Sequence, residues 1–279
     1  MIVENKNGWM PFLHSDKSIR KESTISNTLQ MSSPVYRLAY KDEDFLKSQE
    51  VRPLRFALEL MKVESNLREH NIKSTIVLFG GARIPEPGYS AWAAENAVQK
   101  KNLEAASCYY NEARQFARLC SQYSSTTHYR EFVIVTGGGP GIMEAGNRGA
   151  TDVGAPSIAF NIAVPHEQTP NPYITPDLCF NFHYFAMRKM HFLMRAKALA
   201  IFPGGFGTFD ELFETLTLIQ TSRMERVPIL MFGKIFWKKA LNVDYLAEQG
   251  TISPDDVKLL SFVDNAIEGW ERVRAFYQL

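Results

Sequence analysis

The residues best suited to chemistry are a carboxylate and the glycine-rich turn before it. They lie in the run Phe202-Pro203-Gly204-Gly205-Phe206-Gly207-Thr208-Phe209-Asp210-Glu211. An apolar stretch, 198–202, precedes the turn, and a helical pattern starts at Phe209. Glycine lets backbone N–H groups approach an anion, and a helix start presents unpaired donors and the positive end of the dipole. The spacing therefore predicts a phosphate site, with Glu211 placed for chemistry beside the phosphate.

Glu211 also has a structural interpretation. Thr208-x-x-Glu211 fits a capping box, in which Thr208 caps the helix and Glu211 reaches back to the backbone. Spacing alone favours this cap slightly. Location favours catalysis, because a carboxylate near a phosphate site can orient water or stabilise an oxocarbenium-like sugar, as carboxylates do in glycoside hydrolysis. Both roles stay open, and both could hold in turn, with the cap present only when the site is empty.

Arg188 is the second candidate for chemistry. The pair Arg188-Lys189 lies among apolar residues on a largely buried predicted helix. A buried arginine is rare unless it is paired, so either a ligand or a core-facing acid such as Glu211 is its expected partner. These two partners are equally compatible with the sequence. Glu167, in Pro165-His166-Glu167-Gln168, follows a predicted strand and could reach a sugar, although a lone loop carboxylate is more often only solvated.

Two more glycine loops follow predicted strands. Gly80-Gly81 follows 74–79, and Gly137 to Gly141 follows 132–136. Ligands of open parallel sheets bind beyond the carboxyl ends of the strands, so three such loops favour a nucleotide-type ligand. The second loop lacks the final glycine of the dinucleotide motif, no acidic residue ends the strand 157–163, and no Walker-type Gly-Lys-Ser/Thr occurs. The expected ligand is a mononucleotide rather than NAD or a triphosphate.

The elements that position these loops alternate along the chain. Strands are predicted at 74–79, 132–136, 157–163, 179–182, 198–202 and 228–232, and helices at 50–71, 89–124 (one or two), 142–151, 184–197, 209–221, 236–248 and 266–277. Strands apolar on both faces that alternate with helices predict an α/β fold with a doubly wound parallel sheet, Rossmann-like. We expect an N-terminal arm and helical extension over 1–71, and a nucleotide-binding catalytic domain over 72–279.

The composition limits the partners and the compartment. The chain has 279 residues, 45% of them hydrophobic, and a formal net charge of +1. This charge gives no reason to expect nucleic acid or a membrane surface as a partner. No apolar stretch could span a bilayer, and the polar N-terminus does not resemble a signal peptide. The three cysteines, Cys108, Cys120 and Cys179, lack metal-type spacing, so we expect no metal and a cytoplasmic location.

Three motifs resemble those of the LOG family. They are Gly137-Gly138-Gly139-Pro140-Gly141-Ile142-Met143, Arg188-Lys189, and the Pro-Gly-Gly-x-Gly-Thr-x-x-Glu run that ends at Glu211. The resemblance covers about residues 74 to 235, and longer members with a helical N-terminal extension are the most similar. Members of this family are cytokinin-activating nucleoside 5′-monophosphate phosphoribohydrolases, often labelled lysine decarboxylases. This chain has Phe185-Ala186-Met187 where the family typically has Met-His-Glu, and Gly80-Gly81 where it usually has Gly-Ser.

The resemblance implies hydrolysis of the N-glycosidic bond of an AMP-like or cytokinin nucleotide, without a cofactor. Glu211 would position water and support the cationic sugar, and Arg188 would hold the substrate and help the departing base. The implied substrate-binding residues are Gly81, Gly138, Gly139, Glu167, Lys189, Gly204, Gly205, Gly207 and Thr208. A homodimer with its site near the interface is also implied.

Two other activities are weighed against this one. The first is a non-catalytic nucleotide or cofactor carrier or sensor, because the same sheet serves such proteins. A carrier would have no need of both Arg188 and Glu211. The second is the decarboxylase, which would need a Schiff-base lysine for pyridoxal phosphate, and neither Lys189 nor Lys197 lies in a recognisable site of that kind.

Overall fold

The structure is a computed structural model that describes residues 28–164 and 169–279. The chain divides into two compact units, Met1–Arg55 and Phe56–Leu279. The boundary expected near residue 72 thus differs from this division, since most of helix α4 (Arg52–Glu69) belongs to the larger unit. Within the described ranges, no helix is both long and apolar enough to cross a membrane.

A seven-stranded sheet forms the centre of the larger unit. Its strands are β1 (Thr75–Phe79), β2 (Val133–Thr136), β3 (Ser157–Ile162), β4 (Cys179–Phe182), β5 (Ala196–Ile201), β6 (Ile229–Phe232) and β7 (Leu260–Val263). The spatial order is β4-β3-β2-β1-β5-β6-β7, and every neighbouring pair is parallel. The chain order reverses between β1 and β5, which makes the crevice between their carboxyl ends the expected ligand site.

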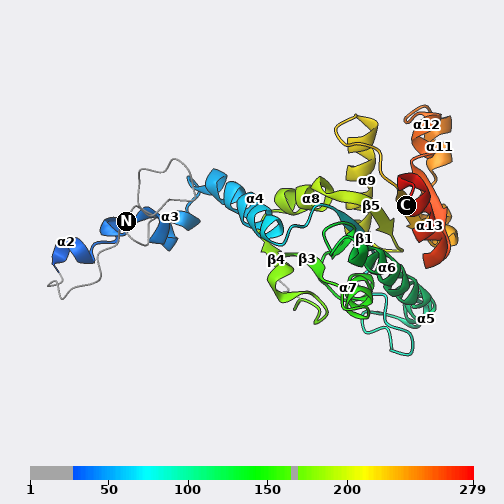
Figure 1. Ribbon diagram of the computed structural model, residues 1–279, viewed down its shortest axis with the longest axis horizontal. Coiled ribbons are helices and arrows are strands. Elements are labelled where there is room, and N and C mark those ends of the chain that lie inside the picture. Colours follow the sequence, from blue (N-terminus) through cyan, green and yellow to red (C-terminus); the bar gives the residue numbers. More distant parts are fainter. Residues whose placement is uncertain (1–27, 165–168) are drawn as a thin grey trace. The chain divides into compact units, whose positions relative to one another are not determined.

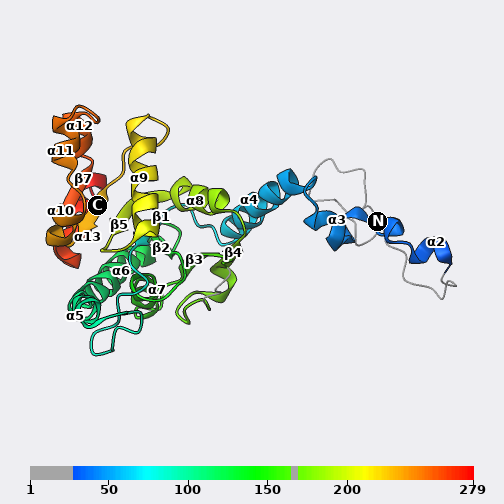
Figure 2. The ribbon, with the colours of Figure 1, turned by 180° about the vertical axis from the view of Figure 1, so that it is seen from behind.

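Helices connect the strands and cover both faces of the sheet (Figures 1 and 2). Besides α4, they are α5 (Ala97–Ala105), α6 (Cys108–Thr126), α7 (Ile142–Thr151), α8 (Phe185–Met194), α9 (Phe206–Gln220), α10 (Lys234–Ala240), α11 (Val243–Glu248), α12 (Pro254–Val257) and α13 (Ala266–Tyr277). The predicted α/β doubly wound parallel sheet is confirmed.

The alternation of side chains along each strand builds a separate core on each face. In β1, Val77 and Phe79 pack into the core that also receives Phe192 of α8 and Leu212 of α9. Residues one step along the strand, such as Leu78, enter the opposite core, which is built with α6, α7 and α13. Each fully buried side chain of this kind stabilises the fold by about 1.5–3 kcal/mol. The two cores together fix the positions of the helices that start and end at the site.

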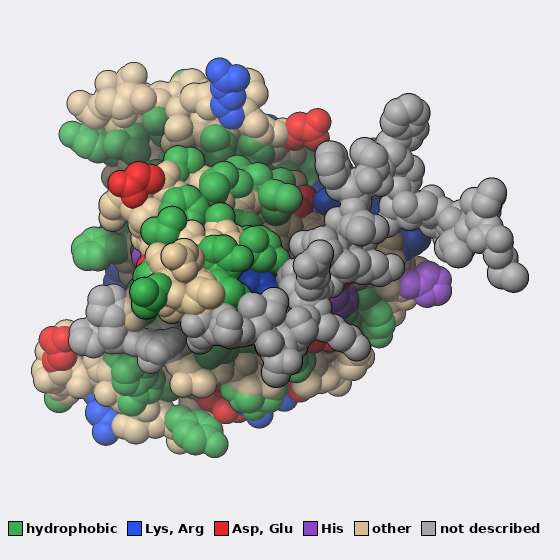
Figure 3. All heavy atoms as spheres, turned by 90° about the vertical axis from the view of Figure 1, so that its left-hand side faces the viewer, with side chains coloured by type: hydrophobic (Ala, Val, Ile, Leu, Met, Phe, Trp, Pro, Cys, Tyr) green, Lys and Arg blue, Asp and Glu red, His purple; other side chains and the backbone are tan. Residues whose placement is uncertain are grey.

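The described residues of the smaller unit, 28–55, form short helices ahead of α4. They are α2 (Leu29–Ser32), the 3-10 turns Pro34–Tyr36 and Ala39–Lys41, and α3 (Glu43–Lys47). None of them buries a residue, and several large apolar side chains are exposed, among them Val35 and Tyr36. Figure 3 shows hydrophobic side chains at the surface on the face that it presents.

Several predicted boundaries were wrong. The helix predicted at 184–197 ends at Met194, and β5 starts at Ala196, two residues before its predicted start. The stretch predicted as one helix at 236–248 is two helices, α10 and α11, because the chain is extended at Leu241. Strand β7 and helix α12 were not predicted. The stretch predicted as one or two helices at 89–124 forms two, α5 and α6, but the first begins only at Ala97, so residues 89–96 were wrongly predicted as helical.

Candidate active site

Three glycine loops meet at the carboxyl edge of the sheet. The backbone N–H of Gly81, after β1, donates to the carbonyl of Pro203, after β5, at 2.9 Å. The N–H of Ile142, after β2, donates to the carbonyl of Gly81 at 3.3 Å. These bonds join the ends of β1, β2 and β5, so the loops predicted from sequence converge at the crevice between β1 and β5.

The loop after β2 is held by a buried asparagine that sequence reasoning missed. Asn171 Nδ2 donates to the carbonyls of Gly138 and Gly139, at 3.1 and 3.2 Å. Gly138 has φ +77, and a Cβ there would overlap the side-chain amide of Asn161. Both the conformation and the space therefore require glycine. Nothing in the sequence marks Asn171 as a support of this loop, because the two loop carbonyls that it binds are more than thirty residues away.

A cavity of about 240 Å³ lies where the loops meet, and it brings most of the predicted site together. Gly81, Gly205, Gly207 and Thr208 line it with Arg188 and Glu211, and so do Phe79, Gly80, Ala82, Gly137 and Met143. An adjoining cavity of about 280 Å³ shares Gly137, Met143 and Arg188 with it and reaches Gly139 and Asn161. Arg188 therefore borders both spaces.

Helix α9 begins earlier than predicted, which corrects the capping-box interpretation. The N-cap is Gly205, and the helix starts at Phe206, so Thr208 is its third residue. The side chain of Thr208 caps nothing, and Oε2 of Glu211 has no hydrogen-bond partner among the described residues. The extended backbone of Gly205 lets the chain turn directly into the helix. Within the described chain, the N–H groups of Gly205, Phe206 and Gly207 meet no acceptor, so they remain available to an anion.

Glu211 is buried, with 4% of its surface exposed. Burial raises the pKa of its carboxyl from an ordinary value of 4.5 to about 7, and the nearby charges of Arg188 and Lys189 oppose part of this rise. A carboxyl group with a pKa near 7 can exchange protons at physiological pH. Buried titratable groups with perturbed pKa values in a cleft are candidates for catalysis.

Arg188 faces the same cavity from α8. Its Nε donates to the carbonyl of Phe160 at 2.7 Å, and its guanidinium lies over the ring of Phe192, 5.3 Å from the centroid. Burial lowers the pKa of this guanidinium, and the charge of Glu211 opposes the shift. The ion-pair alternative is wrong, because Arg188 and Glu211 form no ion pair among the described residues. Both groups therefore remain available to a ligand.

The remaining predicted residues lie outside this cavity. Lys189 Nζ contacts Asp210 Oδ1 at 2.7 Å and Glu214 Oε2 at 3.1 Å, and Lys189 is not one of the residues that line the cavity. Gly204 lines a third cavity, which shares Gly81, Ala82 and Gly205 with this one. Glu167 falls outside the described residues.

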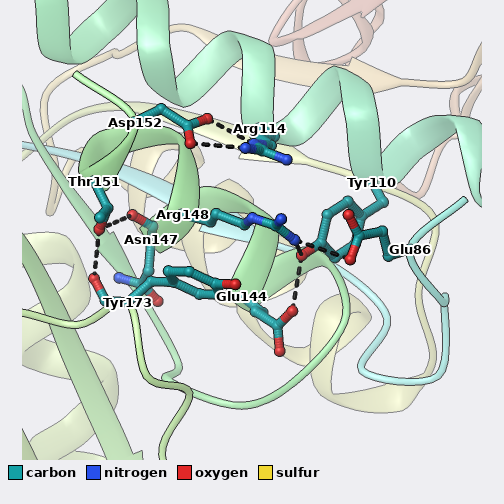
Figure 4. A network of polar contacts seen from close by, with 9 residues as sticks. All are labelled: Glu86, Tyr110, Arg114, Glu144, Asn147, Arg148, Thr151, Asp152 and Tyr173. Atoms are coloured by element: carbon teal, nitrogen blue, oxygen red, sulfur yellow. Dashed lines mark hydrogen bonds and ion pairs between the residues drawn. The ribbon is translucent and has the colours of Figure 1, made fainter.

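A network of polar side chains connects α6 and α7 to the segment that follows Gly81 (Figure 4). Arg148 of α7 pairs with Glu86 at 2.9 Å and lies over the ring of Tyr173. Tyr110 of α6 donates to Glu144 of α7 at 2.8 Å, and burial raises the pKa of the Tyr110 hydroxyl. Since Glu86 belongs to the segment that follows Gly81, this network anchors that segment to α7. Sequence patterns gave no signal of it.

A comparison with protein families agrees with the resemblance that the sequence motifs indicated. A family model described as possible lysine decarboxylase matches residues 143–273. This match confirms the resemblance to the LOG-type family stated from the motifs. No curated protein matches the chain.

Solved structures with a similar fold have low sequence identity. A molybdenum cofactor binding protein from Rippkaea orientalis is 13% identical with a TM-score of 0.48, and the match covers 74% of this chain and 98% of that one. The molybdenum cofactor carrier protein of Chlamydomonas reinhardtii is 15% identical with a TM-score of 0.44, and the match covers 73% of this chain and 99% of that one. These matches concern the fold alone.

The family description raises the question of a pyridoxal phosphate site. Such a site needs a lysine at the reacting centre. Among the described residues, the three cavities at the loops are lined by no lysine. Lys189 is held in its ion pairs, and Lys197 lies over the ring of Tyr277. The site described here does not fit that cofactor.

Proposed function

We propose that the protein hydrolyses the N-glycosidic bond of a nucleoside 5′-monophosphate, releasing the free base and ribose 5-phosphate. The observation that carries this proposal is the buried carboxyl of Glu211, which lies in one cavity with Arg188 and the first turn of α9 and whose Oε2 has no hydrogen-bond partner in the described part of the chain. A phosphate at the N–H groups of Gly205 and Gly207 would place a ribose beside that carboxyl. AMP-like and cytokinin nucleotides are the proposed substrates, in a cytoplasmic homodimer.

The reaction requires a water and a stabilised cationic sugar. The bond between the anomeric carbon and the base nitrogen breaks, and its electron pair leaves with the base. Glu211 in its ionised form stabilises the oxocarbenium-like sugar and takes a proton from the attacking water. Arg188 holds the substrate beside it, and its charge favours the electron-rich departing base. The base nitrogen takes up a proton from solvent as it leaves, and Glu211 afterwards releases to solvent the proton that it took from the water.

Base release from a panel of nucleoside monophosphates tests this function. The assay follows free base by chromatography, for the wild type and for Glu211→Gln. We expect the wild type to release base from at least one nucleotide, and Glu211→Gln to be slower by about a hundredfold or more. A wild type that binds a nucleotide but releases no base would instead support the non-catalytic carrier. Full activity of Glu211→Gln would remove the role given to that carboxyl.

A further inference from the structure

A third cavity lies beside the glycine turn at 203–205. It has a volume of about 580 Å³, larger than either cavity at Arg188. Its walls are mainly apolar and aromatic, formed by Ile84, Leu103, Ala106, Tyr109, Pro203 and Phe236. A pocket of this size and lining suits a ring system of a small ligand. Neither catalytic residue lines it, so the proposed monophosphate leaves it unused.

The third cavity adjoins the catalytic cavity, the one lined by Arg188 and Glu211. Gly81, Ala82 and Gly205 line both spaces. A Cβ added at Gly205 would meet no atom within 4 Å, so the space above this residue is open. Because Gly205 is the N-cap of α9, the opening lies where the substrate phosphate is proposed to bind. A ligand that continues beyond that phosphate would enter the third cavity over Gly205.

A cationic side chain, that of Arg83, lies at the third cavity. Arg83 lines it, is exposed, and forms no hydrogen bond or ion pair with the described residues. An unpaired guanidinium is well suited to a phosphate, because its planar donors match the phosphate oxygens. The chain lacks the glycine fingerprint for a pyrophosphate, so a second phosphate would depend on this side chain instead.

We propose that the site accepts nucleoside 5′-diphosphate esters whose far end carries an aromatic ring, with that ring in the third cavity and the second phosphate at Arg83. This inference rests on the proposed function, because it places the first phosphate and the reacting ribose as described above. The chemistry is unchanged. Water adds to the anomeric carbon, the bond to the base nitrogen breaks, and the base leaves with a proton, which gives free base and the ester of ribose 5-diphosphate.

Binding to the full-length chain tests the inference without relying on turnover. Diadenosine diphosphate is the probe, because its two halves are identical and its orientation does not matter, and AMP is the comparison. Calorimetry uses the Glu211→Gln variant, so that neither compound is consumed. We expect diadenosine diphosphate to bind about tenfold more tightly than AMP, since a buried ring and a charge-assisted contact are added.

Two variants of the third cavity complete the test, each made in the Glu211→Gln background. Leu103→Trp fills the cavity, and Arg83→Gln removes the cation from an exposed position where the fold does not depend on it. Each variant should remove most of the difference in affinity between diadenosine diphosphate and AMP, and leave the affinity for AMP unchanged. Val98→Trp is the matched control, because Val98 lies on the same helix as Leu103 but is 69% exposed and lines none of these cavities.

The outcomes separate this inference from the proposed function. Equal affinities for the two compounds, or an advantage that survives both Leu103→Trp and Arg83→Gln, would overturn the inference. Base release from AMP by the wild type would then still support the monophosphate hydrolase. An advantage that both variants abolish would support the second subsite even if the wild type released no base, in which case only the hydrolase would be lost.

Discussion

Glu211 is the residue whose burial most needs an explanation. A buried carboxyl without a partner for Oε2 destabilises the folded protein once it is ionised. Among residues 28–164 and 169–279, no cap or ion pair accounts for the burial of this carboxyl. A buried carboxyl of this kind is typical of an active site, where residues that lower the stability of the fold are retained because they provide reactivity.

The pH dependence of stability follows from the raised pKa of Glu211. Below its ordinary pKa of 4.5, both the folded and the unfolded states hold the proton. Between pH 4.5 and about 7 only the folded state does, so stability falls as the pH rises through this window. Glu211→Gln, which stays neutral, should therefore raise the free energy of unfolding at pH 8 by about 1–3 kcal/mol. Urea unfolding at pH 5 and pH 8 measures this, and an unchanged or lower stability of the variant at pH 8 would contradict it.

The rate should show the opposite trend with pH. If Glu211 acts in its ionised form, kcat/KM rises as the pH passes through about 7, where the pKa of the carboxyl lies. A pH-rate profile of base release over pH 5 to 9 tests this. A profile that is flat across neutral pH would show that ionisation of Glu211 does not limit the reaction.

Lys189 supports a prediction that distinguishes two roles. Its ion pairs with Asp210 and Glu214 join α8 to α9. Its positive charge also lowers the pKa of Glu211. A positioning role predicts that Lys189→Met moves the rise of the rate profile to higher pH, while Lys189→Arg restores it. A substrate-binding role predicts that Lys189→Met instead weakens binding of ribose 5-phosphate. Rate profiles and calorimetry separate the two.

At the scale of elements, the first turn of α9 is the part that meets the proposed phosphate. Gly207 is inside this helix, and a Cβ there would meet no atom within 4 Å. Gly207→Ala should therefore raise stability by about 0.5–1 kcal/mol through helix propensity. The same methyl group would enter the cavity, so KM should rise by about tenfold. Thermal unfolding and steady-state kinetics test both effects.

Gly138→Ala is the matched control for Gly207→Ala. At Gly138 the positive φ and the amide of Asn161 leave no room for a methyl group, so stability should fall. If Gly207→Ala left KM unchanged, the phosphate would not bind at the first turn of α9. If Gly138→Ala were as stable as the wild type, the account of the loop after β2 would be wrong.

Sequence patterns located the loops better than the ends of the elements. Long apolar runs such as 74–79 predicted their strands, because each is buried on both faces. The start of α9 was misplaced, since glycine at positions 205 and 207 is typical of a loop and the extended conformation of Gly205 is not visible in sequence. Strand β7 was missed because it is short and only partly buried. The side chains of Arg188 and Glu211 were identified, but their lack of a mutual ion pair depends on packing.

For the whole molecule, the sheet order explains why the site forms. The reversal between β1 and β5 leaves a crevice, and the loops after both strands carry glycine where the backbones approach. Large apolar side chains are exposed beside it, including Phe206, which is 96% exposed in the first turn of α9. Such side chains are typical of a surface that another protein covers.

The proposed homodimer can be tested on the whole chain. We expect sedimentation equilibrium at micromolar concentration to give twice the chain mass of 31.7 kDa. Phe206→Ser should weaken the association, because it removes exposed apolar surface next to the site. A wild type that remains a monomer under these conditions would contradict the proposed assembly and leave the single-chain cavity as the complete site.

The most direct test of the central claim compares base release by the wild type and by Glu211→Gln, from the preferred nucleotide at saturation. The account predicts that kcat falls by about a hundredfold or more in the variant, while calorimetry gives both proteins the same affinity for ribose 5-phosphate. Equal rates of base release by the two proteins, or no release by a wild type that binds the nucleotide, would contradict it.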